Sequence, residues 1–257
     1  MMVLKTAREI DCLREAGRIA ADALSWAGRN AVPGRTTAEL DAGVEAILHE
    51  RGATPVFKGY HGFPASICAS VNDEIVHGIP GPRVLQEGDV ISIDVGARFK
   101  GFVGDNARTF EVGAVSDEAT RLLETTKASL DAGIAAARTG GMLSEIARAI
   151  QEKAEGGGYA LVRDYAGHGV GREMHEEPQV PNFVDENLLR NDVTLEEGLV
   201  IAIEPMLCVG KGRTKVASDR WTVLTTDGGL AAHFEHSIAF TRDGVEILTL
   251  PSEEDYR

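Results

Sequence analysis

Isolated charged side chains interrupt core-like segments of this sequence. Asp94 lies within the apolar run 90–95, Glu204 ends the run 199–204, and Glu235 lies in the segment 233–240. Asp105 follows Asp94 across an expected turn, and His168 stands in the glycine-rich segment 167–171. A buried carboxylate without a partner is costly or takes up a proton. Four carboxylates and one imidazole therefore predict a site for two divalent cations, which would bridge and activate a water for hydrolysis.

The donor types restrict the choice of metal. Oxygen-rich ligands with one imidazole suit manganese, iron(II), cobalt or zinc better than a metal that prefers thiolates. The cysteines Cys12, Cys68 and Cys208 form no CxxC pair, which excludes a zinc ribbon and argues against a disulfide framework. Reduced thiols fit the cytoplasm. The segment 175–179 lacks the second histidine of HExxH, so a zincin helix is also excluded.

The two aspartates are expected on a β-hairpin. If the turn centres between Phe99 and Lys100, Asp94 and Asp105 face each other with Cβ atoms about 5 Å apart. Like charges in that arrangement repel unless a cation lies between them. Gly101 comes one position late for a favoured two-residue turn, and a bulge would move the register by one residue.

Each of the five candidates has an ordinary structural alternative. A single carboxylate is explained as a strand end, a turn former, an edge residue or part of a solvated strand face. A histidine among glycines is explained by a bond to the backbone. The occurrence of all five together favours a shared metal site over these separate explanations.

Composition excludes several classes of protein. The chain has 257 residues, a net charge of -14 and a pI near 4.9, which argues against a general nucleic-acid binder. A local basic group in one expected loop, Lys211, Arg213, Lys215 and Arg220, is explained as a solvated loop. The N-terminus has no signal-peptide core, and no apolar stretch reaches the ~20 residues of a membrane span.

The order of expected elements repeats. Helical periodicity predicts helices over about 6–30, 37–51, 116–138 and 144–155, and strand-like segments follow each pair of helices. Expected strands include 89–97, 102–111, 199–208 and 231–241. No linker separates the halves, so we expect a single α+β domain over 1–257 with pseudo-repeat halves of about 1–115 and 116–257.

At this point the sequence resembles the type I methionine aminopeptidases. The five candidates occur in the order and contexts of that family, in the segments 92–96, 104–107, 167–171, 203–206 and 234–237. Flanking segments 59–64, 70–80 and 175–179 match as well, and the similarity spans residues 4 to 249. The resemblance implies the pita-bread (creatinase/aminopeptidase-like) fold, with two pseudo-symmetric halves around a curved antiparallel sheet. It also implies removal of the initiator methionine from nascent proteins whose second residue is small.

The resemblance implies a role for each site residue. Asp94, Asp105 and Glu235 would bind one metal, and Asp105, His168, Glu204 and Glu235 the other, the ions being Co2+, Mn2+, Fe2+ or Zn2+. An activated water would attack the carbonyl that follows the first methionine. Glu204 would move its proton to the leaving amine.

Two further histidines and an apolar pocket complete the implied site. His175 would polarise the scissile carbonyl and His77 would hold the scissile amide. The methionine pocket would be formed by Tyr60, Phe63, Cys68 and Trp221, with His77 at its edge. This sequence departs from many bacterial members at Phe57, where a small residue is common, and at Met174, where an aromatic is common. Both residues would reshape the pocket without touching the ligands.

Rival functions use the same residues. An Xaa-Pro peptidase of the same fold would share the metal site, but such enzymes usually carry a large N-terminal domain. A catalytically inactive paralogue that acts as a binding module would usually have lost ligands, and a structural ion-binding protein would rarely draw them from five separate segments. Only 28 residues separate His175 from Glu204, which favours type I over the type II enzymes with their added subdomain, and no N-terminal zinc-binding extension is seen.

The expected partners and location follow from the resemblance. They are N-terminal methionyl peptides and nascent chains, with transient ribosome contact, no membrane and no nucleic-acid specificity. We expect a cytoplasmic monomer.

Overall fold

Capped amphipathic helices open both halves of the chain. In the computed structural model, which describes residues 2–252, α1 (Ala7–Asn30) and α2 (Thr37–Glu50) precede the first strands. α3 (Asp117–Ala136) and α4 (Leu143–Gly156) precede the second set, and a short α5 (Glu186–Arg190) follows later. Thr6 and Thr36 begin α1 and α2 with capping boxes, and the Ser116 hydroxyl caps α3. The four long helices match the expected ones apart from their end residues.

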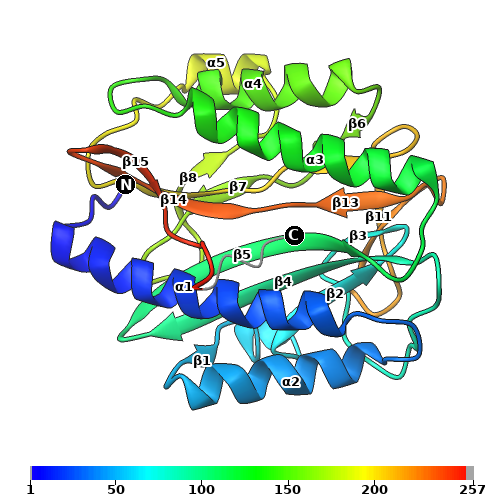
Figure 1. Cartoon of the computed structure of the whole chain (residues 1–257). Coiled ribbons are helices and arrows are strands. Elements are labelled where there is room, and N and C mark those ends of the chain that lie inside the picture. Colours follow the sequence, from blue (N-terminus) through cyan, green and yellow to red (C-terminus); the bar gives the residue numbers. More distant parts are fainter. Residues whose placement is uncertain (1, 253–257) are drawn as a thin grey trace.

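Antiparallel strands fill the space between the helices (Figure 1). One sheet contains β1 (Thr54–Pro55), β2 (Ile67–Val71), β4 (Val90–Phe99) and β5 (Phe102–Glu111). A five-stranded sheet has the order β15 (Gly244–Ile247), β14 (His236–Thr241), β9 (Val200–Ile203), β7 (Gly167–Gly169) and β8 (Glu176–Val180).

Two small sheets complete the strand arrangement. One has the order β13 (Ala231–His233), β10 (Met206–Cys208) and β6 (Ala160–Leu161). The other has the order β11 (Thr214–Val216), β12 (Val223–Thr225) and β3 (Glu74–Val76), and a 3-10 turn, η1 (Tyr60–Gly62), lies before β2. The sequence did not predict α5, β1, β7, β8 or β11, all of which are short elements.

Each helix pair covers one side of the strands. Figure 1 shows α1 and α2 on one side and α3 and α4 on the other. α1 lies so close to β5 that a Cβ on Gly104 would come within 2.3 Å of the Gly17 backbone nitrogen. One buried apolar cluster is built wholly from residues between 19 and 112, and a second lies mainly on α3, α4 and later strands.

A third apolar cluster joins the two halves. It combines Ile10, Phe57 and Phe63 with Val170, Met174 and other residues from the later strands. Several residues of this cluster also line the cavity described below. No helix within residues 2–252 has the length and apolar character needed to cross a membrane.

Candidate metal centre and active site

The β4–β5 hairpin positions two aspartates on one face of its sheet. Asp94 lies opposite Ala107, and Asp105 lies opposite Gly96. The expected direct pairing of Asp94 with Asp105 is therefore wrong, since each aspartate pairs two positions away from the other. Because the shift is even, both side chains still point to the same face, as diagonal neighbours.

The turn explains the difference in register. It consists of Lys100 and Gly101, both with positive φ (50° and 82°), as a two-residue type I′ turn requires. Gly101 thus occupies the second central position of the turn, where glycine is favoured. The hairpin needs no bulge. Glycine adopts positive φ without steric cost, so Gly101 permits the turn that sets the register of this hairpin.

Glu204 and Glu235 lie in gaps between strands. The expected strands 199–208 and 231–241 are each interrupted at the carboxylate, so β9 gives way to β10 and β13 gives way to β14. Pro205 has no N–H to continue a ladder, and the N–H of Glu235 donates to the carbonyl of Ala107 at 2.8 Å. Both interruptions therefore have local causes.

The two gaps occur at the same level. Ile203 pairs with His236 before the gap, and Met206 pairs with His233 after it. This common register puts the two glutamates opposite each other, at the point where the ribbon passes from the five-stranded sheet to a three-stranded sheet. The two glutamates therefore lie outside the strands of both sheets.

His168 comes from β7 and faces these carboxylates. Its Nδ1 lies 2.9 Å from the carbonyl oxygen of Gly169, which can only accept, so Nδ1 carries a proton. Its Nε2 lies 3.5 Å from Asp105 Oδ2 and 3.6 Å from Glu204 Oε1. Burial lowers the pKa of His168, but Asp105 and Glu204 outweigh it and raise that pKa to about 9. A cation at Nε2 would replace the proton that the carboxylates otherwise attract.

The site gathers carboxylates that are buried and close together. Asp105 and Glu235 are almost fully buried. Burial, and then the neighbouring carboxylates, raise the pKa values of Asp94 and Glu235 well above their ordinary range. Among residues 2–252, no group forms a hydrogen bond with one oxygen each of Asp94, Asp105 and Glu235. Buried carboxylates of this kind are stabilised when they coordinate a cation.

The geometry fits such a cation. One ligand atom each of Asp105, His168 and Glu235 lie within 4.8 Å of one another. Three donor atoms this close together are candidates for ligands of one shared cation. The oxygens without hydrogen-bond partners are the donors that hard and borderline divalent ions prefer.

A cavity of about 150 Å³ opens beside these ligands. It is lined by every site residue predicted from the sequence: Asp94, Asp105, His168, Glu204, Glu235, His77, His175, Tyr60, Phe63, Cys68 and Trp221. Phe57 and Met174, the two departures from the family pattern, line it as well. The chain therefore brings together in one cavity residues that lie far apart in the sequence.

The two accessory histidines differ in exposure. His175 lies at the exposed mouth of the cavity, with its Nδ1 2.7 Å from the hydroxyl of Tyr60. His77 is half-buried, has a positive φ of 60° and packs edge-on against Tyr165. Burial is the largest cause that lowers the pKa of both histidines. Both imidazoles are therefore neutral near neutral pH.

One buried histidine at the site was not predicted. His233 Nε2 lies 3.6 Å from Glu204 Oε2, on the other carboxylate oxygen from the one that faces His168. The Thr109 hydroxyl holds its backbone, accepting from the His233 N–H and donating to its carbonyl. A signal was present in the sequence, since the expected strand 231–241 would put residues 233 and 235, which are two apart, on one face.

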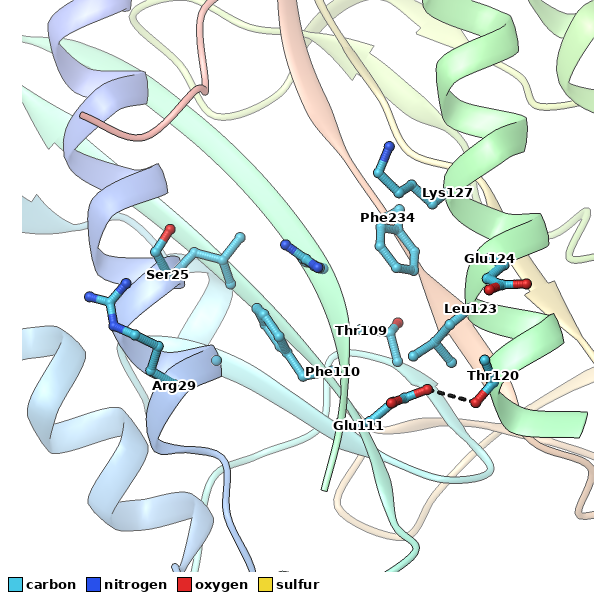
Figure 2. Close-up of a pocket in the computed structure, with 13 residues that line it drawn as sticks. Ser25, Arg29, Thr109, Phe110, Glu111, Thr120, Leu123, Glu124, Lys127 and Phe234 are labelled. Atoms are coloured by element: carbon cyan, nitrogen blue, oxygen red, sulfur yellow. Dashed lines mark hydrogen bonds between the residues drawn. The ribbon is translucent and has the colours of Figure 1, made fainter. Parts of the chain in front are cut away.

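Cavity size alone does not identify the site. A larger groove of about 520 Å³ lies between α1 and α3, with Phe110 and Phe234 among its lining residues (Figure 2). It contains none of the predicted site residues. The convergent carboxylates and imidazoles, and not the volume, distinguish the smaller cavity.

Comparisons with known proteins agree with this geometry. The model of the metallopeptidase family M24 matches residues 11–242. The methionine aminopeptidase of Clostridium acetobutylicum is 48% identical over 251 residues, covering 97% of this chain and 99% of that protein. A solved methionine aminopeptidase from Thermotoga maritima superposes with a TM-score of 0.94 at 41% identity, covering 97% of this chain and 100% of that one.

A solved relative of the rival class is more distant. The prolidase from Pyrococcus furiosus superposes with a TM-score of 0.77 at 25% identity, and the match covers 98% of this chain but only 66% of the prolidase. These likenesses show the pita-bread fold expected from the sequence. Similarity over the full length of both chains favours the methionine aminopeptidases over the prolidases. The chain therefore belongs to the metallopeptidase family M24 and, within it, to the type I methionine aminopeptidases.

Proposed function

We propose that the ligand cluster holds two divalent ions, Co2+, Mn2+, Fe2+ or Zn2+. Asp94, Asp105 and Glu235 would hold one ion, and Asp105, His168, Glu204 and Glu235 would hold the other, with Asp105 and Glu235 common to both sets. The observation that carries this proposal is the set of buried carboxylate oxygens without hydrogen-bond partners beside His168. When bound, the ions supply Lewis acidity that activates a water and polarises a carbonyl.

The reaction is removal of the N-terminal methionine from nascent proteins whose second residue is small. Full-length relatives that are methionine aminopeptidases support this reaction. Glu204 takes the proton of the attacking water and passes it to the leaving amine. Its side chain suits this role because it is only 13% exposed and yet lines the cavity.

The two accessory histidines act on the scissile peptide. His175 donates a hydrogen bond to the carbonyl oxygen as negative charge develops there. If the Tyr60 hydroxyl donates to Nδ1 of His175, the ring proton stays on Nε2, where it can serve the substrate. His77 holds the scissile amide, and its lowered pKa keeps it neutral for that contact.

The apolar end of the cavity binds the methionine side chain. Phe63 and Trp221 pack edge to face with ring centroids 5.1 Å apart. Tyr60 and Cys68 complete the pocket, and burial raises the pKa of the Cys68 thiol, so the sulfur stays neutral and polarizable. Phe57 also lines this cavity.

The proposal extends to the domain organisation, the location and the partners of the enzyme. Residues 1–257 act as a single catalytic domain with halves of about 1–115 and 116–257, which is supported by the apolar cluster that joins them. The protein is a cytoplasmic monomer, consistent with its free cysteines. It contacts the ribosome transiently.

The proposal is tested by methionine release from Met-Gly-Met-Met. Metal-stripped protein should be inactive, and Mn(II), Co(II) or Fe(II) should restore release. Asp94→Ala should abolish the restored activity, because one ion loses a ligand. Metal content of the folded variant should fall below that of the unchanged protein.

Two outcomes would reject the proposal. Preferential cleavage of Ala-Pro peptides over Met-Ala-Ser would favour an Xaa-Pro peptidase. Folded protein that binds no metal and releases no methionine would favour an inactive binding module.

A further inference from the structure

The turn 171–176 brings His175 and Met174 to the cavity, but residues of the first half hold it. The N–H of Val103 on β5 donates to the carbonyl of Gly171 at 2.9 Å. The Arg172 guanidinium reaches Glu9 on α1 at 3.3 Å. The position of His175 therefore depends on contacts with segments far from it in the sequence.

A buried ion pair lies at the base of this turn. Lys5 Nζ contacts Glu176 Oε2 at 2.8 Å, and the two side chains are only 3% and 12% exposed. The other oxygen of Glu176 accepts from the backbone N–H groups of Arg172 at 2.9 Å and Glu173 at 3.3 Å. One carboxylate thus connects the N-terminal segment to the backbone directly before His175.

The carboxylate and the ammonium both lie against the backbone. Glu176 Oε1 occupies the space beside Gly171, where an added Cβ would lie 2.2 Å from it. The N–H of Lys5 donates to the carbonyl of Gly198 at 2.7 Å, which fixes the start of the lysine side chain. A buried ion pair with defined geometry loses its favourable energy when one partner is removed, because the other charge stays buried.

We propose that Lys5 is a positioning residue for catalysis: its ammonium group holds the Glu176 carboxylate, which in turn fixes the turn that carries His175. This inference rests on the role proposed above for His175. Without the ammonium, Glu176 turns toward water and releases the N–H groups of Arg172 and Glu173. His175 then loses its alignment with the scissile carbonyl, while the metal ligands keep their own supports on β4, β5, β7 and the β9–β14 ribbon.

The test uses charge removal with retention of volume. Lys5→Met keeps the apolar stem, Glu176→Gln keeps the acceptor oxygen, and the double variant leaves no buried charge at all. Lys127→Met is the matched control, because Lys127 pairs with Asp131 on the exposed face of α3. Each full-length protein is loaded with the same metal, checked for fold and metal content, and assayed with Met-Ala-Ser.

We expect Lys5→Met to lower kcat about tenfold to a hundredfold, with KM and metal content unchanged, since small misplacements of a catalytic group have effects of this size. Glu176→Gln should lower kcat as well, because it leaves the Lys5 charge buried. The double variant should recover most of the lost kcat, and Lys127→Met should match the unchanged protein. In spectra of 15N-labelled histidine, the His175 resonances should shift in Lys5→Met and return in the double variant.

The inference is overturned if Lys5→Met retains kcat, or if His175 resonances are the same in every variant. Loss of metal together with kcat would show a structural role only. Should Lys5→Met fail to fold, the double variant still decides: normal folding with low kcat and shifted His175 resonances would contradict the proposed rescue. If even the unchanged protein releases no methionine, the proposed function fails, while the histidine spectra still test the effect of Lys5 on His175.

Discussion

At the scale of single residues, four carboxylates and two imidazoles share a small buried volume. Glu204 lies between His168 and His233, each with a nitrogen 3.6 Å from one of its oxygens. Burial and mutual repulsion raise the pKa values of Asp94 and Glu235. Buried carboxylates that repel one another lower the stability of the folded protein when no cation is bound. This loss of stability should be measurable in metal-free protein.

We expect Asp94→Asn to stabilise the metal-free protein. Because the folded-state pKa of Asp94 is raised above the ordinary 3.8, its contribution to stability is present at low pH and is lost as the pH rises through the folded pKa. The advantage of the variant should therefore grow from about pH 4 upward. Urea denaturation in EDTA over a series of pH values measures it, and a variant less stable at every pH would contradict this account.

Saturating metal supplies the control for that experiment. With Mn(II) added in excess, the order of stability should reverse, because asparagine is a poorer ligand than aspartate. If Asp94→Asn were the more stable protein both with and without metal, Asp94 would not contribute to metal binding.

At the scale of elements, short local features determine where the ligands point. The Lys100–Gly101 turn sets the register that keeps Asp94 and Asp105 on one face. Pro205 interrupts the ladder beside Glu204. Each feature is small, and each one aims a carboxylate toward the cavity.

Gly101→Ala should lower the free energy of unfolding by about 1 kcal/mol, because alanine disfavours positive φ. Gly101 has a φ of 82°, and a Cβ there would meet nothing closer than 3.6 Å, so the cost would come from the backbone alone. Gly81→Ala is the matched control, since Gly81 lacks a positive φ and has open space around it. Chemical denaturation of both variants measures the difference, and equal stabilities would refute the assigned turn.

At the scale of the whole molecule, the site lies where the two halves meet. Asp94 and Asp105 come from strands of the first half, whereas the other three proposed ligands come from the second. The turn that carries His175 is likewise held by Lys5, Glu9 and Val103. Binding of ions at this point should therefore stabilise both halves together.

Metal at about 100 times its dissociation constant should stabilise the protein by about 2.7 kcal/mol per site. In hydrogen exchange, we expect slower exchange in both β4–β5 and β9–β14 after metal addition. Asp94→Ala should reduce the protection in both segments. Protection confined to one half would be evidence against ligands shared between the halves.

The sequence by itself determined the long helices, the strand pairs of the central hairpin and the identity of the chemical groups. These follow from periods of several turns and from charged residues in apolar runs, which are local signals. The two aspartates were correctly expected on one face, although their register was wrong by two positions. The short strands β7, β8 and β11 were not predicted, because their sequences show no clear periodicity.

Only the tertiary structure decided which groups meet. The break of two expected strands at Glu204 and Glu235, the position of His233 beside Glu204, and the pair Lys5–Glu176 all depend on contacts between distant segments. Such contacts arise because burial of the joint apolar cluster brings the halves together, and a single charged residue in the sequence does not indicate its partner. The sequence thus identified the kinds of chemical group at the site, and packing between the halves determined their arrangement.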